Sequence, residues 1–318
     1  MSTWEIILQL LITGLANGLI IALIALGYTM VYGIVELINF AHGDVMMLGC
    51  FLALTVVGLL GGEVAAPWLA IGLMLLLVPP FCAALNWLID RHVYRPLRNA
   101  PKLTVLVSAI GVSFVCVNLG MFWGGLPMEV FGGGSQAASA KSFPELIGYT
   151  NLLGENSAVL LTYKELMVAV ITVPLMIALT WFVSRTRLGT AMRAVAQNPT
   201  AAQLMGIDTN RVVGLTFIIG GALAGVAAVT TALYTGSISF QMGYRNGLDA
   251  FTAAVLGGIG NLPGAVLGAL CIGLARAVME GWVPNGGQWS NTVVFSVLIL
   301  VLVFRPTGIL GSRVREKV

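Results

Sequence analysis

The chain has 318 residues, of which 58% are hydrophobic and 9% are charged, and its formal net charge is +3. Soluble domains carry about 25% charged residues, so this composition excludes a soluble fold. At about 20 residues per helical crossing, we expect an all-α polytopic membrane protein of eight to ten transmembrane helices. It would form one domain, residues 1–318, in the lipid bilayer.

The first apolar stretch, from Glu5 to Leu60, is too long for one helix. Glu5 stands where a cleaved secretory signal would carry positive charge, so we expect a retained first helix and two or three crossings. A polar string interrupts the stretch: Glu36, Asn39, His42, Gly43 and Asp44.

Polar groups at membrane depth are costly and normally face a cavity or the bundle interior. Asn39, His42 and Asp44 are therefore candidates for lining a translocation path or its gate. Asp44 has a second interpretation, because an aspartate there could cap a helix that runs from Val45 to Leu60. The two roles can coincide.

Clear apolar runs follow at residues 66–89, 103–123, 165–184, 212–235 and 290–304, each near the length that a bilayer core requires. Most basic residues fall in three clusters between or after these runs. Because Lys and Arg stay on the cytoplasmic side of a membrane, the clusters mark three cytoplasmic segments. The clusters are Arg91, Arg95, Arg98 and Lys102; Arg185, Arg187, Arg193 and Arg211; and Arg305, Arg313, Arg315 and Lys317.

The segment from Gly124 to Lys164 lies between two apolar runs, is rich in Gly and Ser, and carries more acidic than basic residues. By the same charge rule it is the large outer loop. It is either a docking surface for a substrate-delivering partner or a solvated connector.

The second basic cluster contains signals for a short helix. Asn198 is a good cap, Pro199 needs no amide partner at a first helical position, and Gly206 is a good stop. We predict a helix from Pro199 to Met205 that exposes Ala201, Ala202 and Met205. Such a helix suits insertion into a cleft of a partner subunit, or it lies on the membrane interface.

Residues 249–279 would reach roughly 46 Å as one helix, but Gly257–Gly264 contains four glycines and a proline that would break it. Cytoplasmic placement of the last two clusters also requires this segment to enter and return. Asn261 in the break is a further candidate for the path or gate. The break faintly echoes residues 39–49, as in transporters built from repeats. Arg276 and Glu280 are spaced as an i, i+4 ion pair.

The sequence contains no catalytic constellation. No Lys follows Gly as a phosphate-binding GxxxxGK[ST] loop requires, and two histidines do not supply a multi-histidine metal site. Ser113 is more consistent with helix packing than with a nucleophile. The four separate cysteines are typical of small buried hydrophobic residues. We predict no catalytic residue, no metal and no bound cofactor, and no nucleic-acid partner, because membrane orientation explains the basic residues.

Several strings resemble the permease subunits of branched-chain amino acid ABC importers, in the same order and over residues 22–311. They are ALIALGYTMVYGIVELINFAHGDVMMLG, RAVAQNPTAAQLMGIDTNRV, LTFIIGGALAGVAA, FTAAVLGGIGNLPGAVLG and RPTGILG. The resemblance is closer to the shorter of that family's two membrane subunits.

The resemblance implies a multi-pass protein of the bacterial inner membrane that imports leucine, isoleucine and valine. Its partners would be a second permease, two cytoplasmic ATP-binding subunits that hydrolyse ATP, and a periplasmic amino-acid-binding protein. The segment meeting an ATPase would be residues 189–206, with Gly189, Arg193, Asn198, Pro199, Ala202, Met205 and Gly206.

Two alternatives stay open at this point. Importers of urea and short amides carry similar strings, usually with Met-Ala-His-Gly-Glu where this chain has Phe-Ala-His-Gly-Asp. A stand-alone secondary transporter would use Glu36, Asp44 or Asp249 as an ion-coupling carboxylate.

Overall fold

The computed structural model describes residues 2–35, 39–61, 66–98, 100–134, 136–154, 157–305 and 307–311, apart from the side chain of Lys102. In this part of the chain, eight helices are long and apolar enough to cross a membrane. The expected all-α polytopic fold is confirmed. The long helices are α1 (Thr3–Val35), α2 (Ala41–Leu59), α3 (Pro67–Ile89), α4 (Lys102–Gly124), α5 (Tyr163–Arg185), α8 (Thr209–Thr235), α10 (Leu262–Trp282) and α11 (Gly286–Phe304), with the shorter α9 (Met242–Gly257).

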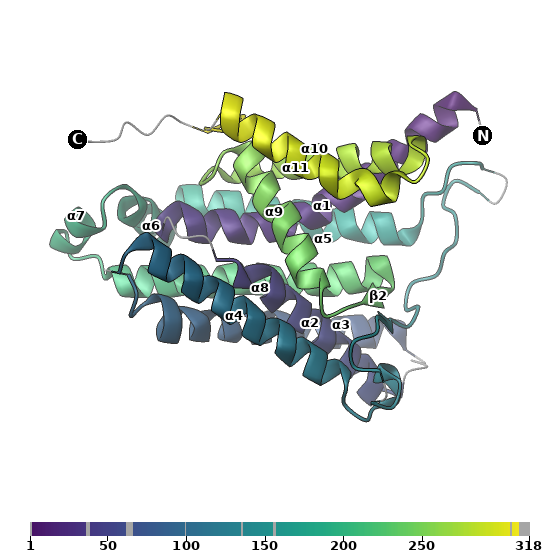
Figure 1. The fold of residues 1–318 in the computed structure, drawn as a ribbon, viewed down its shortest axis with the longest axis horizontal. Helices are drawn as coiled ribbons and strands as arrows, with labels where there is room; N and C mark the ends of the chain where they lie inside the picture. Colours follow the sequence, from purple (N-terminus) through teal and green to yellow (C-terminus); the bar gives the residue numbers. More distant parts are fainter. Residues whose placement is uncertain are drawn as a thin grey trace.

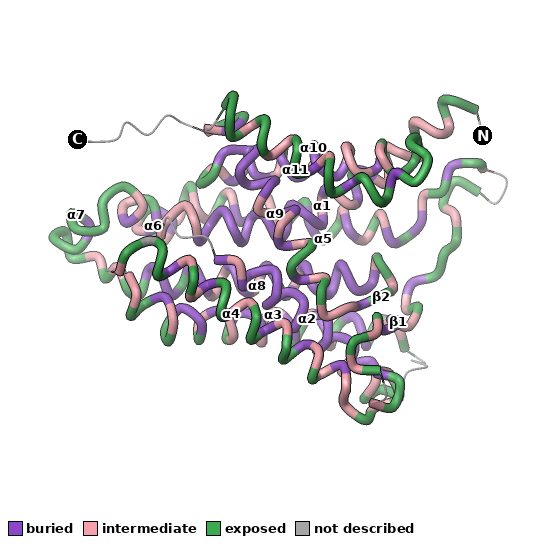
Figure 2. The backbone as a smooth tube through the Cα atoms, in the orientation of Figure 1, coloured by how far each residue is buried: buried purple, intermediate pink, exposed green. Residues whose placement is uncertain are grey.

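Most of the long helices run lengthwise through the molecule, whereas α9 crosses them steeply (Figure 1). Helix α1 packs along α10, α3 packs along α8, and α2 contacts α3, α4, α8 and α9. The buried backbone is concentrated in α1, α2 and α8 (Figure 2), while α4, α5 and α11 present most of their length outward. The inner helices are therefore shielded by other helices, and the outer ones are available to lipid or to partner subunits.

The described parts of the basic clusters lie at one end of the molecule, which we call the basic end. Helices α6 (Arg187–Gln197) and α7 (Pro199–Leu204) lie there with the C-terminus, and the N-terminus lies at the opposite end (Figure 1). Arg98, after α3, donates a hydrogen bond of 2.6 Å to Asn210 near the start of α8. The preference of Lys and Arg for the cytoplasmic side predicts that the basic end faces the cytoplasm. Arg313, Arg315 and Lys317 lie outside the described residues.

The predicted break near residue 258 is confirmed. Helix α9 ends at Gly257, the backbone turns through Gly258 and Gly260 with φ of 107° and 85°, and α10 starts at Leu262. The two helices then pack so closely that a Cβ atom on Gly268 would lie 2.9 Å from the amide nitrogen of Gly257. The segment enters and returns, as the placement of the basic clusters required.

The expected pair between Arg276 and Glu280 is wrong. Arg276, on α10, forms an ion pair of 2.7 Å with Asp249 on α9 and a hydrogen bond of 2.7 Å with Asn291 on α11. Both partners of the ion pair are largely buried, so a charge across the hairpin satisfies the arginine better than a solvent-exposed neighbour one turn away.

The outer loop packs against the bundle. A short 3-10 helix, η2 (Glu129–Phe131), buries Phe131, and β1 (Lys141–Ser142) pairs antiparallel with β2 (Ser237–Ile238), which follows α8. The ammonium of Lys141 donates to the carbonyl oxygens of Phe131 and Gln136 at 2.8 and 2.6 Å, and burial lowers the pKa of this lysine. A purely solvated connector is therefore the wrong description of this part of the loop.

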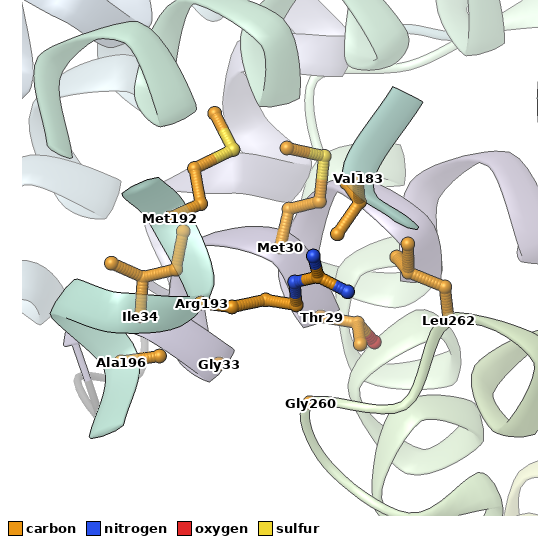
Figure 3. A pocket seen from close by; sticks show the side chains of 10 residues that line it. All are labelled: Thr29, Met30, Gly33, Ile34, Val183, Met192, Arg193, Ala196, Gly260 and Leu262. Atoms are coloured by element: carbon orange, nitrogen blue, oxygen red, sulfur yellow. The ribbon is translucent and has the colours of Figure 1, made fainter. Parts of the chain in front are cut away.

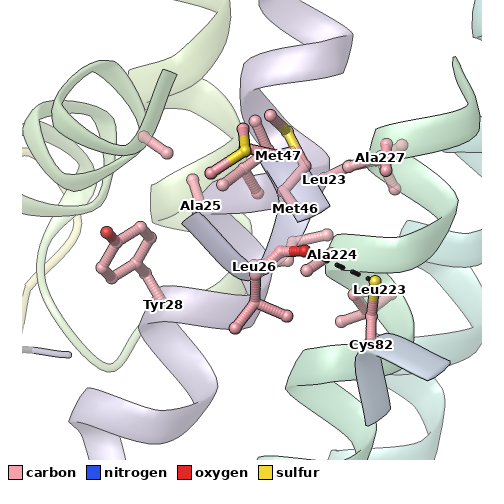
Figure 4. Close-up of a cluster of buried hydrophobic side chains, with 14 of the residues drawn as sticks. Leu23, Ala25, Leu26, Tyr28, Met46, Met47, Cys82, Leu223, Ala224 and Ala227 are labelled. Atoms are coloured by element: carbon pink, nitrogen blue, oxygen red, sulfur yellow. Dashed lines mark hydrogen bonds between the residues drawn. The ribbon is translucent and has the colours of Figure 1, made fainter. Parts of the chain in front are cut away.

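The core between α1, α2, α3 and α8 combines aliphatic side chains with small residues (Figure 4). The thiol of Cys82 contacts the carbonyl oxygen of Val45 at 3.5 Å. Cys50, Cys82 and Cys116 are buried as expected, but Cys271 is exposed, because it lies on the outward face of α10.

Candidate functional site

The start of α2 carries the polar motif that the sequence singled out. Helix α2 begins at Ala41, so that His42, Gly43 and Asp44 form its first turn, and the side chains of His42 and Asp44 are buried. Gly43 allows α9 to approach, because a Cβ atom at this position would lie 2.8 Å from the Cα atom of Gly247. Glu36 lies outside the described residues.

Asp44 bridges two helices instead of capping one. Its Oδ2 accepts a short hydrogen bond from the hydroxyl of Ser113 on α4. The helix begins three residues before Asp44, and its cap position, Phe40, has no side-chain cap. The capping interpretation is therefore wrong, and Ser113 connects helices as the sequence indicated. The other carboxylate oxygen has no hydrogen-bond partner among the described residues.

His42 is enclosed by α1. Its ring packs edge-on against Tyr28 with 4.8 Å between ring centroids, and a Cβ atom on Gly27 would lie 2.6 Å from the imidazole Cε1. Neither ring nitrogen has a hydrogen-bond partner in the described part of the chain. Buried polar groups are normally paired, so this histidine is an exception within the bundle.

Asn39 connects the break before α2 to two other helices. Its Oδ1 accepts a hydrogen bond of 2.8 Å from the hydroxyl of Tyr94, and its Nδ2 donates a hydrogen bond of 3.3 Å to Asn86 on α3. Asn86 in turn donates 2.7 Å to the carbonyl oxygen of Phe217 on α8. Tyr94 lies in η1 (Asp90–Tyr94), a π-helical turn after α3. Asn86 and Tyr94 were missed in the sequence, although Asn86 is a lone amide in the apolar run at 66–89.

We expect Tyr94→Phe to lower the free energy of unfolding by about 1–3 kcal/mol, the cost of leaving a buried acceptor unpaired. The reason is that Asn39 would lose the 2.8 Å hydrogen bond to its Oδ1. Thermal unfolding in detergent measures the effect. Tyr244→Phe is the control, because the Tyr244 side chain is 63% exposed; equal melting temperatures for the two variants would contradict the role of the network.

The segment at residues 185–211 forms a helical corner at the basic end. Thr186 caps α6, and a Cβ atom on Gly189 would lie 2.6 Å from the carbonyl oxygen of Phe182, so only glycine fits this bend. The predicted helix after Asn198 is confirmed as α7, with Asn198 accepting 2.9 Å from the amide of Ala201. The chain leaves it through Gly206, at φ 84°.

The predicted exposed face of α7 is partly wrong. Ala202 is only 4% exposed, because this side of α7 packs toward α8 and the Ala202 carbonyl accepts the amide of Ile207 at 3.0 Å. The exposed apolar side chains are Leu204 and Met205, at 85% and 83%. Leu204 was not recognised in the sequence. The corner therefore presents two large apolar side chains at the basic end.

Asn261 has two structural contacts in the break before α10. Its Oδ1 accepts a hydrogen bond of 3.1 Å from the amide of Gly264, so Asn261 is the N-cap of α10. Its Nδ2 donates a hydrogen bond of 2.7 Å to the carbonyl oxygen of Leu310. These contacts hold the break against the C-terminal segment. A role of Asn261 in the path or gate stays a prediction.

A cavity of about 90 Å³ opens where the end of α1, helix α6 and the break before α10 meet (Figure 3). Arg193 of the corner extends into it. The cavity thus joins the segment that carries α7 to the glycine-rich break. It is lined by Thr29, Met30, Gly33, Ile34, Val183, Met192, Arg193, Ala196, Gly260 and Leu262.

An apolar helical bundle with interrupted helices, buried polar side chains at the interruptions and an exposed corner at its basic end has the features of a membrane permease. Residues 10–302 match the family described as the permease component of the branched-chain amino acid transport system, and the chain belongs to this family. Members of the family are components of multi-component transporters.

Similar proteins cover nearly the whole chain. It is 44% identical to the permease protein BraD of Pseudomonas aeruginosa over 98% of both chains. It is 38% identical to LivH of Escherichia coli, covering 98% of this chain and 97% of that protein. Both are described as permease proteins of high-affinity branched-chain amino acid transport systems. A probable branched-chain amino acid permease of Methanocaldococcus jannaschii is 25% identical over 92% of this chain.

Proposed function

We propose that this chain is a membrane subunit of an ATP-driven importer of branched-chain amino acids in a bacterial inner membrane, with residues 1–318 forming one permease domain. It would form the translocation path with a second permease. Two cytoplasmic ATP-binding subunits would hydrolyse ATP, and a periplasmic binding protein would deliver leucine, isoleucine or valine. The observation that carries this proposal is the 44% identity to BraD over 98% of both chains.

The geometry of the basic end supports coupling to a cytoplasmic partner. Helix α7 projects Leu204 and Met205 from a corner fixed by Gly189 and Asn198. Burying such side chains in a cleft is favourable, whereas two exposed apolar groups on a polar surface gain nothing alone. We propose that residues 189–206, including Arg193, Pro199 and Gly206, transmit the motion of the ATP-binding subunits.

The buried motif at the start of α2 supports a gating role. His42 and the free oxygen of Asp44 lack partners in the described arrangement, while Asn39 is fully engaged with Tyr94 and Asn86. We propose that Asn39 anchors the start of α2 and that His42 and Asp44 change partners as the path opens. Asn261 would hold the second break in the same way, through its bond to Leu310.

The ion pair across the hairpin weakens the form of the secondary-transporter alternative in which Asp249 is the ion-coupling carboxylate. Asp249 is paired with Arg276 at 2.7 Å, so an ion-coupling cycle would have to break a largely buried charge pair. An importer of urea or short amides remains the second candidate for the substrate, because only one or two residues of the motif at Phe40–Asp44 separate the two groups.

Uptake of radiolabelled leucine into proteoliposomes tests the proposal. We expect uptake only when the second permease, the ATP-binding subunits, the binding protein and internal ATP accompany this chain. Radiolabelled urea is the parallel substrate. Uptake by this chain alone without ATP would favour the secondary transporter, and uptake of urea without leucine would reassign the substrate.

A further inference from the structure

The cavity at the basic end has a volume of about 90 Å³, while a single water needs only about 10–15 Å³. It is large enough for several waters or for the polar head of a small molecule. Its walls come from α1, the end of α5, α6 and the start of α10, so parts of the chain that are far apart in the sequence meet here.

One wall of the cavity is suited to an anion. The guanidinium of Arg193 extends into the cavity (Figure 3), and its Nη2 donates a hydrogen bond of 3.3 Å to the hydroxyl of Thr190. A guanidinium carries five N–H donors in a fork that matches a carboxylate, so donors remain for a ligand. Gly260 and Leu262 bring the N-terminus of α10 to the same cavity, and a helix N-terminus carries partial positive charge.

A buried hydroxyl in the wall supplies an independent sign of a ligand. Thr29 is 1% exposed and lines the cavity, and its Oγ1 has no hydrogen-bond partner in the described part of the chain. In other helices, Thr216 and Thr252 donate to the carbonyl one turn earlier, at 2.9 and 2.8 Å. Leaving a buried hydroxyl unpaired costs free energy, and a ligand oxygen in the cavity would remove this cost.

The remaining walls suit the other parts of an aliphatic amino acid. Gly33 and Ile34 belong to the last turn of α1, and the C-terminal end of a helix carries partial negative charge that favours an ammonium group. The other lining side chains are mainly apolar and would contact a branched alkyl group: Met30, Ile34, Val183, Met192 and Leu262.

We propose that this cavity is a cytoplasmic exit subsite in which Arg193 and Thr29 hold the carboxylate of an aliphatic amino acid on its way out of the permease. The proposal rests on the proposed function and adds a place for the substrate. Arg193 lies on α6, which leads directly into α7. A partner that moves α7 would therefore displace the carboxylate ligand relative to α1 and α10, and so link release to the ATP cycle.

Saturation-transfer difference NMR with L-leucine tests the subsite. The sample is the nucleotide-free complex of the two permeases and the ATP-binding subunits in phosphatidylcholine nanodiscs. The periplasmic binding protein is left out, so that leucine bound to it does not contribute to the signal. We expect a signal from the leucine methyl groups that L-leucinamide does not displace, because leucinamide lacks the carboxylate. Arg193→Gln should weaken the apparent affinity by about tenfold or more, since it removes a charged hydrogen-bond donor. Thr29→Val should weaken it less.

Arg187→Gln is the matched control, because this substitution removes the same charge from the same helix. Arg187 is exposed and does not line the cavity. Equal leucine binding by the two arginine variants, or displacement by leucinamide, would overturn the proposal. The phosphate of an anionic lipid has similar chemistry. Loss of the signal on adding phosphatidylglycerol would assign the cavity to lipid and also overturn it.

ATP-driven leucine uptake by the complete wild-type transporter is measured in parallel. Absence of uptake rejects the proposed function itself. Normal uptake together with leucine binding that does not depend on Arg193 rejects the exit subsite alone.

Discussion

We expect Gly43→Ala to prevent stable folding of the bundle, with a loss of at least about 3 kcal/mol, at the upper end of what overpacking costs. The new methyl group would lie 2.8 Å from the Cα atom of Gly247 and still closer to the carbonyl oxygen of Gly243. Both are backbone atoms of α9, so no side chain can turn aside to make room. The melting temperature in detergent and the yield of monodisperse protein measure the effect.

Gly111→Ala is the matched control for this variant. Gly111 is an exposed helical glycine on α4, and a Cβ atom there would meet nothing within 4 Å. Alanine should leave stability unchanged or slightly improve it, because glycine is the poorer helix former. If Gly43→Ala melted at the same temperature as Gly111→Ala, α2 and α9 could not cross as closely as the structure has them.

Structural features that depend on a few neighbouring residues could be predicted from the sequence. The break between α9 and α10 follows from glycines and a proline, and α7 follows from Asn198, Pro199 and Gly206, whose backbone preferences act within a few residues. The apolar runs gave five helices directly, because length and hydropathy suffice in a membrane.

Features that depend on distant neighbours could not be predicted. Arg276 pairs with Asp249, 27 residues away, instead of with the carboxylate one turn along its own helix. Ala202 is buried because α7 packs toward α8, which a helix signal alone does not reveal. Asp44 bonds to Ser113, 69 residues away, and Asn39 depends on Tyr94. In each case the residue type indicated a polar or packing role, but the partner was set by tertiary packing.

The packing of α7 toward α8 decides which substitutions can test coupling through the helical corner at residues 185–211. Ala202→Glu would place a carboxylate in the buried contact between α7 and α8, so lost uptake could reflect local unfolding and not lost coupling. Leu204 and Met205 are better targets, since both are mostly exposed in this chain and their replacement leaves its own core intact.

We expect Leu204→Glu with Met205→Glu to reduce leucine uptake by more than about tenfold, because burial of each side chain in a partner cleft contributes about 1.5–3 kcal/mol. The ATP-binding subunits should no longer co-purify with the permease, while its melting temperature stays unchanged. Gln203→Glu, an exposed neighbour on the same helix, adds one charge and should keep both uptake and co-purification. If the ATP-binding subunits remained bound to the double variant, α7 would be a helix on the membrane interface, since only the lipid contact would depend on those two side chains.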